Sequence, residues 1–243
     1  MSEIRFHPMA DGRRIAFRKA EGRGPTYLFL PGYMSDMAGG KATALFDRAV
    51  AEGRACLLLD YSGCGESDGR FAEGTLSRWR EEVLALAAAE TQGPLILVGS
   101  SMGGWLMLLC ALELGARLAG LIGIAAAPDF TDWGYGEDQK ALLAAGETIH
   151  QENPYGPEPT PTHAGFWRDG EALRLLDRPI AIDCPVRLLH GQRDAEVPWE
   201  IALRIAEGLR SDDVQVILIK DGDHRLSREG DIDLLLRTAA ALS

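Results

Sequence analysis

The sequence lacks several features that mark specialised classes of protein. Only 4 of its 243 residues are cysteines and none are spaced as Cys-x-x-Cys, which argues against a disulfide scaffold or a cysteine-based metal site. The 5 histidines are isolated, without a His-x-x-x-His pair. No apolar run approaches the ~20 residues that a membrane-spanning helix needs. We therefore expect no metal site, no cofactor and no stable membrane insertion.

Positive charge is also in short supply. The chain has 25 Lys and Arg against 36 Asp and Glu, a net charge of −11 at pH 7. Such a balance disfavours nucleic acid or an anionic membrane surface as a partner. The first eleven residues carry acidic side chains without an apolar core, so no secretory segment is predicted. Cys56, Cys110 and Cys184 lie in or beside apolar runs and suit a reducing compartment, which favours a soluble, cytoplasmic protein.

Apolar strand-like runs alternate with amphipathic helical segments along most of the chain. Continuous apolar strands separated by helices are typical of a mainly parallel sheet covered on both faces. The length fits one α/β domain, here residues 1–243. The expected strands cover residues 14–18, 26–30, 55–60, 94–98, 119–126, 185–189 and 214–219, and the expected helices cover residues 41–52, 76–90, 104–115, 199–209 and 232–242.

Residues 129–183 interrupt this alternation. They predict a helix over 137–150, a proline-interrupted tract over 153–161 and a short second helix over 171–177. An insertion at the carboxyl end of a strand lies over the ligand crevice of an open α/β sheet. We therefore interpret the segment as a small helical cap rather than as an independent domain.

Ser101 is the strongest candidate for a nucleophile. It is the third residue of Gly99-Ser-Ser-Met-Gly103, which lies between the apolar run 94–98 and a helical segment. In this context Gly-x-Ser-x-Gly forms a sharp turn that exposes the serine hydroxyl at the end of the sheet. The flanking glycines are required because strand and helix approach closely there. Ser100, the second residue of the motif, would point away from the turn.

A serine nucleophile needs a base and a group that orients the base, and the expected chain order is Ser, acid, His. Asp194 and His224 each follow a predicted strand, so both should emerge at the same edge of the sheet as Ser101. His190 is too close to Asp194 to take the role of the base and more readily braces that turn. Asp223 is the nearest rival acid, but its adjacency to His224 directs its carboxylate elsewhere.

An oxyanion hole requires two N–H donors directed at the developing charge. One should be the amide of Met102, directly after the serine, and the other the amide of Tyr33, in the loop that follows the strand at 26–30. Gly32 lets that backbone turn close to the serine. The glycine-rich stretch 60–69 lacks the Gly-Lys-Ser/Thr ending of a phosphate loop, so we interpret it as a structural loop that borders the pocket.

These residues together resemble the serine α/β-hydrolases, in particular the esterases and thioesterases that act on acyl glucuronides and palmitoylated proteins. The resemblance implies Ser101 as nucleophile, Asp194 as acid and His224 as base. Pro31 stands where many α/β-hydrolases have His before the oxyanion glycine, and the subgroup is similar in having Pro. The matching stretches are residues 29–37 (FLPGYMSDM), 60–69 (DYSGCGESDG), 98–107 (VGSSMGGWLM), 184–191 (CPVRLLHG), 197–199 (VPW) and 223–225 (DHR).

The resemblance implies a small-molecule ester or thioester as substrate, with S-acylated proteins among the candidates. Two alternatives remain: a non-catalytic binder of small ligands, and a hydrolase-fold enzyme of other chemistry, such as a C–C hydrolase or an acyltransferase. The intact Ser, Asp and His disfavour the binder, which needs none of them. The candidate pocket residues are the aromatic side chains of the expected cap, namely Trp133, Tyr135, Tyr155, Phe166 and Trp167.

Overall fold

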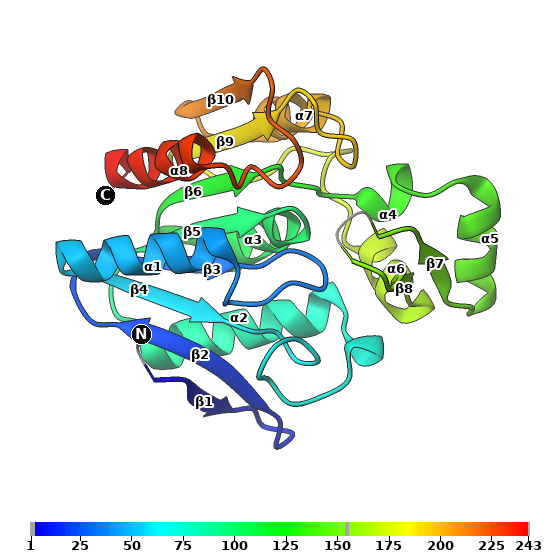
Figure 1. Cartoon of the computed structure of the whole chain (residues 1–243), viewed down its shortest axis with the longest axis horizontal. Coiled ribbons are helices and arrows are strands. Elements are labelled where there is room, and N and C mark those ends of the chain that lie inside the picture. The colour runs from blue at the N-terminus through cyan, green and yellow to red at the C-terminus, as the bar shows by residue number, and fades with distance from the viewer. Residues whose placement is uncertain (1–2, 154–155, 243) are drawn as a thin grey trace.

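One twisted, eight-stranded sheet forms the centre of the fold (Figure 1). The structure is a computed structural model, and it describes residues 3–153 and 156–242. The strand order is β1-β2-β4-β3-β5-β6-β9-β10, and from β4 to β10 all neighbours are parallel, as predicted. Strand β2 runs antiparallel to both β1 and β4. The strands are β1 (Arg5–Pro8), β2 (Arg14–Ala20), β3 (Arg23–Leu30), β4 (Arg54–Leu59), β5 (Leu95–Ser100), β6 (Leu118–Ile124), β9 (Val186–Gly191) and β10 (Val214–Ile219).

Helices cover both faces of the sheet and bury an apolar layer on each. Helices α1 and α8 lie on one face, and α2, α3 and α7 lie on the other (Figure 1). Helix α3 is packed between the sheet and its neighbours, and this burial explains why its sequence is apolar almost all round. The bounds are α1 (Gly40–Glu52), α2 (Leu76–Glu90), α3 (Met102–Leu114), α7 (Glu200–Gly208) and α8 (Glu229–Ala241), with short 3₁₀ turns at Phe71–Glu73 and Gly115–Arg117.

Local signals in the sequence explain where these helices begin and end. The side chain of Thr75 accepts a hydrogen bond from the backbone N–H of Arg78 and so caps α2. Gly53 ends α1 in the left-handed conformation that favours glycine. The expected bounds of these elements and the observed ones differ by a few residues at most, which is the usual scatter at element ends.

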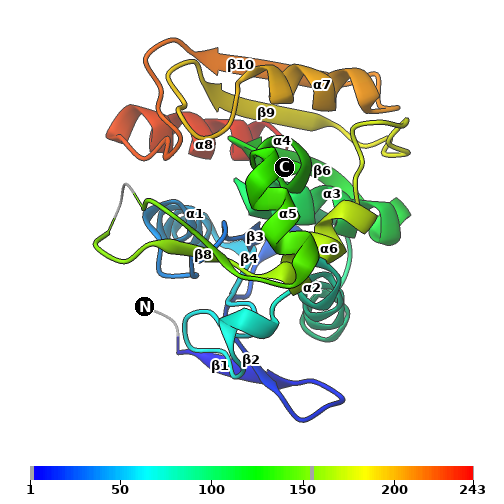
Figure 2. The ribbon, with the colours of Figure 1, turned by 90° about the vertical axis from the view of Figure 1, so that its right-hand side faces the viewer.

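Within the inserted segment, residues 130–153 and 156–172 lie beyond the carboxyl ends of the parallel strands (Figures 1 and 2). They form a layer of short elements: α4 (Phe130–Trp133), α5 (Glu137–Ala145), an antiparallel pair of β7 (Ile149–Gln151) and β8 (Thr160–Thr162), and α6 (Ala164–Ala172). No helix in residues 3–153 and 156–242 is long and apolar enough to cross a bilayer.

Two helices expected in this segment are wrong in detail. The helix expected over 137–150 ends at Ala145, because Gly146 adopts a left-handed conformation and the chain then enters β7. The helix expected over 171–177 is instead α6, which ends at Ala172. The carboxylate of Asp129 accepts the backbone N–H groups of Leu175 and Leu176, and these bonds hold the following chain as a turn.

Candidate active site

Ser101 lies at the tip of the turn between β5 and α3, in a conformation that few non-glycine residues adopt. Its φ and ψ are 55° and −123°, so the backbone is strained there. A Cβ atom on Gly99 would overlap the carbonyl of Gly103, and one on Gly103 would overlap the carbonyl of Leu30. The close approach of strand, helix and neighbouring loop thus explains both glycines of the motif.

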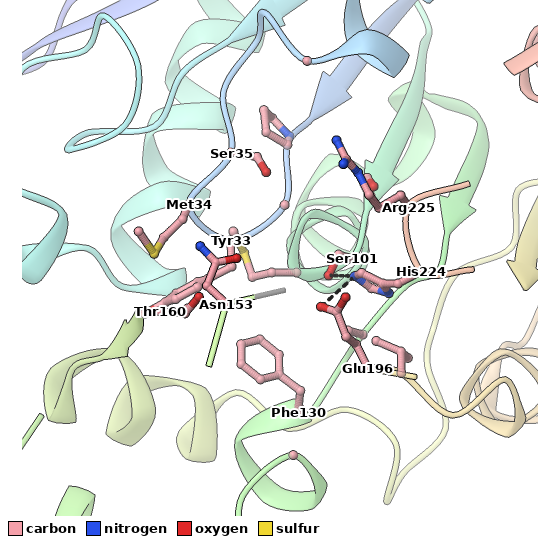
Figure 3. A pocket seen from close by; sticks show the side chains of 18 of the residues that line it. Tyr33, Met34, Ser35, Ser101, Phe130, Asn153, Thr160, Glu196, His224 and Arg225 are labelled. Atoms are coloured by element: carbon pink, nitrogen blue, oxygen red, sulfur yellow. Dashed lines mark hydrogen bonds and ion pairs between the residues drawn. The ribbon is translucent and has the colours of Figure 1, made fainter. Parts of the chain in front are cut away.

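The structure brings Ser101, His224 and Asp194 into one hydrogen-bonded chain. Nε2 of His224 lies 3.0 Å from Oγ of Ser101 (Figure 3), and its Nδ1 lies 2.8 Å from Oδ2 of Asp194. Asp194 lies on the loop after β9 and His224 on the loop after β10, two neighbouring parallel strands. Their side chains therefore meet at the carboxyl edge of the sheet, where β5 also delivers Ser101.

The carboxylate of Asp194 is buried and fully engaged. Its Oδ1 accepts the backbone N–H groups of Glu196 and Val197, both at 2.9 Å, and its Oδ2 lies 3.3 Å from Nε2 of His190. Burial opposes ionisation, but the hydrogen bonds from His190 and His224 outweigh it and hold the pKa of Asp194 well below its usual value. Asp194 therefore remains an anion that can orient His224 and stabilise its protonated form.

The rival residues occupy other positions. His190 is fully buried, and its Nε2 lies 3.1 Å from the carbonyl oxygen of Val197, which fits the expectation that it braces the turn. The carboxylate of Asp223 accepts the backbone N–H of Leu226 at 3.0 Å. The Asp223 carboxylate thus bonds within its own loop and not to His224, as expected for the residue next to His224 in sequence.

The two candidate oxyanion donors flank the serine. Met102 is the first residue of α3, so its N–H has no partner within the helix. The loop that carries Tyr33 passes close to the serine: a Cβ atom added to Gly32 would lie 3.4 Å from the Cβ of Ser101. The positive end of the α3 dipole adds to the potential at this point.

A hydrogen bond connects the glycine-rich loop 60–69 to the loop that carries Tyr33. One oxygen of the Asp60 carboxylate accepts the N–H of Met37 at 2.7 Å, and the other accepts the N–H of Glu66 at 2.9 Å. The loop therefore ties the oxyanion loop to the sheet. The expectation that it borders the pocket is wrong, since none of its residues lines the cavity described next.

A cavity of about 700 Å³ opens above Ser101 and His224. Trp133 and Tyr135 line it, as predicted, whereas Phe166 and Trp167 do not. Phe166 is instead buried in an aromatic cluster, with its ring 4.8 Å from the ring of Tyr33. Trp167 packs against the small cluster of Tyr135, Leu143 and Ile149 and donates its indole N–H to the carbonyl of Thr131. Tyr155 lies outside the described residues.

Several cavity residues were not predicted from the sequence. Phe130 begins the first helix of the inserted segment, and Met34 follows the candidate oxyanion residue; both present apolar side chains to the cavity (Figure 3). Glu196 is two residues from Asp194, and Arg225 directly follows His224. Glu196 and Arg225 could have been identified from the sequence by their closeness to Asp194 and His224.

Lys41 also lines the cavity, from the first turn of α1. Its ammonium group contacts the carbonyl of Arg225 and lies 3.3 Å from Oγ of Ser227. Burial, reinforced by the charge of Arg225, lowers the pKa of Lys41 to about 8. Within the described residues, no cluster of three or more His, Cys, Asp or Glu side chains could hold a metal ion.

Comparison with known proteins places these observations in a family context. The model of the Alpha/beta hydrolase family matches residues 27–233. The chain is 37% identical to human palmitoyl-protein thioesterase ABHD10, mitochondrial, over 98% of this chain and 79% of that protein. It is 42% identical to the mouse protein of the same name, over 92% of this chain and 77% of that protein.

Solved structures agree with the sequence comparison. Alpha/beta hydrolase domain-containing protein 10 from mouse has a TM-score of 0.92 and 39% identity, and the match covers 99% of this chain and 98% of that chain. A putative hydrolase from Agrobacterium vitis S4 has the same TM-score and identity, with 99% of both chains covered. The esterase Est1E from Butyrivibrio proteoclasticus, 20% identical with a TM-score of 0.77, shares the fold.

Proposed function

The chain belongs to the alpha/beta hydrolase family, and on this premise we propose that it is a serine hydrolase that cleaves carboxylic esters and thioesters. Ser101 is the nucleophile, His224 the general base and Asp194 the orienting acid. The observation that carries the proposal is the hydrogen-bonded chain from Ser101 Oγ through His224 to Asp194, at 3.0 and 2.8 Å. A ligand-binding protein would have no use for a nucleophile poised in this way.

The reaction proceeds in two halves. Oγ of Ser101 attacks the acyl carbon while Nε2 of His224 takes its proton, and the amides of Tyr33 and Met102 stabilise the oxyanion. The protonated His224 then delivers the proton to the leaving alcohol or thiol, which departs. Water hydrolyses the acyl-Ser101 intermediate in the second half, with His224 again as base.

The cavity and the relatives support the substrate class. Phe130, Trp133 and Tyr135 give the cavity an apolar wall suited to an acyl chain, and the relatives are named palmitoyl-protein thioesterases. We therefore include S-acylated proteins, beside small esters and thioesters, among the substrates. Residues 129–183 act as a cap within a single domain, because they supply this wall above Ser101.

The cellular location is part of the proposal. The curated relatives are named as mitochondrial, whereas we assign this protein to the cytoplasm. Support comes from the cysteines, all free and three of them buried, as expected in a reducing compartment. Fractionation of the native cell with an antibody to the protein tests the assignment.

Covalent labelling tests the activity directly. A fluorophosphonate should modify the wild-type protein at Ser101, and the label should be lost in Ser101→Ala while Ser100→Ala, its matched neighbour, is still labelled. The same pair should be compared for hydrolysis of a p-nitrophenyl ester and of an acyl thioester. Labelling without turnover of either substrate class would favour a ligand-binding protein, and label on a different residue would refute the assignment of Ser101.

A further inference from the structure

A second carboxylate lies beside the catalytic face of His224. Oε2 of Glu196 is 3.8 Å from Nε2 of His224, the same nitrogen that contacts Oγ of Ser101 (Figure 3). The backbone N–H of Glu196 donates to Oδ1 of Asp194 at 2.9 Å. One loop therefore supplies a carboxylate to each nitrogen of the same imidazole, and the Glu196 carboxylate is the one that lines the cavity.

We propose that Glu196 is a positioning residue that orients the water molecule that hydrolyses the acyl-Ser101 intermediate. This inference rests on the proposed function, because it concerns the second half of that reaction. It assigns to Glu196 a role that the serine, histidine and aspartate do not cover, namely the orientation of the incoming nucleophile.

The geometry follows from the two hydrogens of water. A water molecule that attacks the acyl carbon donates one hydrogen to Nε2 of His224 and needs an acceptor for the other. A water oxygen about 2.8 Å from each of two acceptors that lie 3.8 Å apart subtends an angle of roughly 85° between them, which a bent water molecule accommodates. The carboxylate of Glu196 therefore lies at a suitable distance to accept the second hydrogen.

The step balances without any further reactant. The water oxygen bonds to the acyl carbon as His224 takes one proton, while the second hydrogen is held by Glu196 and stays on the new hydroxyl group. The tetrahedral intermediate then collapses with cleavage of the bond between the acyl carbon and Oγ of Ser101. His224 returns its proton to Oγ, and the carboxylic acid leaves.

This role differs from a general electrostatic effect on His224. The imidazolium forms in both halves of the reaction, so a carboxylate that merely stabilised it would speed acylation and deacylation alike. Orientation of water affects deacylation alone. It also favours water over an alcohol, because an alcohol has a single hydrogen on its nucleophilic oxygen and donates that hydrogen to His224.

The test separates the two half-reactions in the whole 243-residue chain. Glu196→Leu removes the acceptor, Glu196→Gln keeps an acceptor oxygen without the charge, and Glu200→Gln, exposed at the start of α7, controls for the lost charge. Rapid mixing with a p-nitrophenyl ester measures acylation. Acid quenching followed by intact-protein mass spectrometry measures the fraction of acyl-enzyme at steady state.

For Glu196→Leu we expect deacylation to slow by roughly 10- to 100-fold, the range for one hydrogen bond to a charged group, with acylation unchanged and acyl-enzyme accumulating. Glu196→Gln should fall between Leu and wild type, and Glu200→Gln should match wild type. With ethanol added, the ratio of ethyl ester to free acid should rise in Glu196→Leu.

Each other outcome overturns the inference. Equal slowing of both halves would mean a general effect on His224, and unchanged rates would mean no role for Glu196. Failure of the proposed function is distinguishable, because the wild-type protein would then release no p-nitrophenol through a Ser101 adduct. If Glu196→Leu forms the Ser101 adduct and hydrolyses it at the wild-type rate, the role of Glu196 is refuted, whereas the proposed serine hydrolase function stands.

Discussion

The hydroxyl group of Tyr33 donates a hydrogen bond to the carbonyl of Pro161 at 3.0 Å. Its backbone belongs to the candidate oxyanion loop, and Pro161 belongs to β8 in the segment over the cavity. A single side chain thus connects the candidate oxyanion loop to a strand whose residues Thr160 and Thr162 line the cavity. The position of one therefore constrains the position of the other.

Tyr33→Phe should lower kcat by roughly 3- to 10-fold, because one net hydrogen bond of about 1 kcal/mol no longer holds the loop. The matched control is Tyr27→Phe. It removes a hydroxyl group that donates to the backbone carbonyl of Ala239 at 3.1 Å, and Tyr27 does not line the cavity. Steady-state kinetics on one ester decide the matter, and equal losses of kcat in the two variants would contradict the coupling.

Removal of the base should be nearly as damaging as removal of the nucleophile. His224→Ala should reduce kcat/KM by roughly 10⁴- to 10⁶-fold, and Asp194→Asn by roughly 10³- to 10⁴-fold, since the groups act as a unit. Asp223→Asn is the control, because its carboxylate contacts Leu226 rather than His224. A larger loss of kcat/KM in Asp223→Asn than in Asp194→Asn would show that Asp223, and not Asp194, is the acid.

Acyl chain length should control activity through the apolar wall of the cavity. Each buried methylene contributes about 0.8 kcal/mol, or roughly a fourfold gain in kcat/KM. We expect chains of about six to ten carbons to be cleaved much faster than acetate, with a plateau where the cavity ends. A series of p-nitrophenyl esters or thioesters from two to sixteen carbons measures this, and Phe130→Ala should flatten the rise. A maximum at acetate would indicate a closed pocket and a small-ester or acyl-sugar substrate.

Lys41 should make stability depend on pH above neutrality. Burial lowers its pKa in the folded protein to about 8, below the ~10.4 of an unfolded chain. Between these values the unfolded chain binds more protons, so the free energy of unfolding rises with pH. Lys41→Met lacks this titration. Its stability relative to wild type should therefore fall by about 1–3 kcal/mol between pH 7.5 and pH 10. Urea denaturation at both values measures it, and a constant difference would contradict the lowered pKa.

The sequence predicted the sheet and its helices well, because their signals are local. Apolar runs identify buried strands, and Thr75 and Gly53 set helix ends through their own side chain or backbone. The family resemblance and the α/β-hydrolase fold are confirmed by the matches over nearly the whole chain. The placement of Ser101 followed from the Gly-x-Ser-x-Gly motif between a strand and a helix, and the placement of Asp194 and His224 followed from the ends of two predicted strands.

The inserted segment was predicted less well, because its structure depends on distant contacts. The turn after α6 is held by Asp129, more than forty residues away, and no local pattern records that bond. Aromatic residues in the segment were equally ambiguous. Phe166 fills the cluster around Tyr33 and Trp79, whereas Phe130 reaches the cavity, and composition cannot separate the two roles.

The strand order has a consequence for when activity appears during folding. Ser101 follows a central strand, whereas His224 depends on β10, which pairs with β9 at the edge of the sheet. A chain in which β10 has not yet paired with β9 can already have the strained turn at Ser101 and the helices on the sheet. In such a chain His224 is not yet beside Oγ of Ser101. Recovery of reactivity toward a fluorophosphonate after dilution from urea would thus count only molecules that have completed assembly. Spectroscopic probes of helix content would register partly assembled molecules as well.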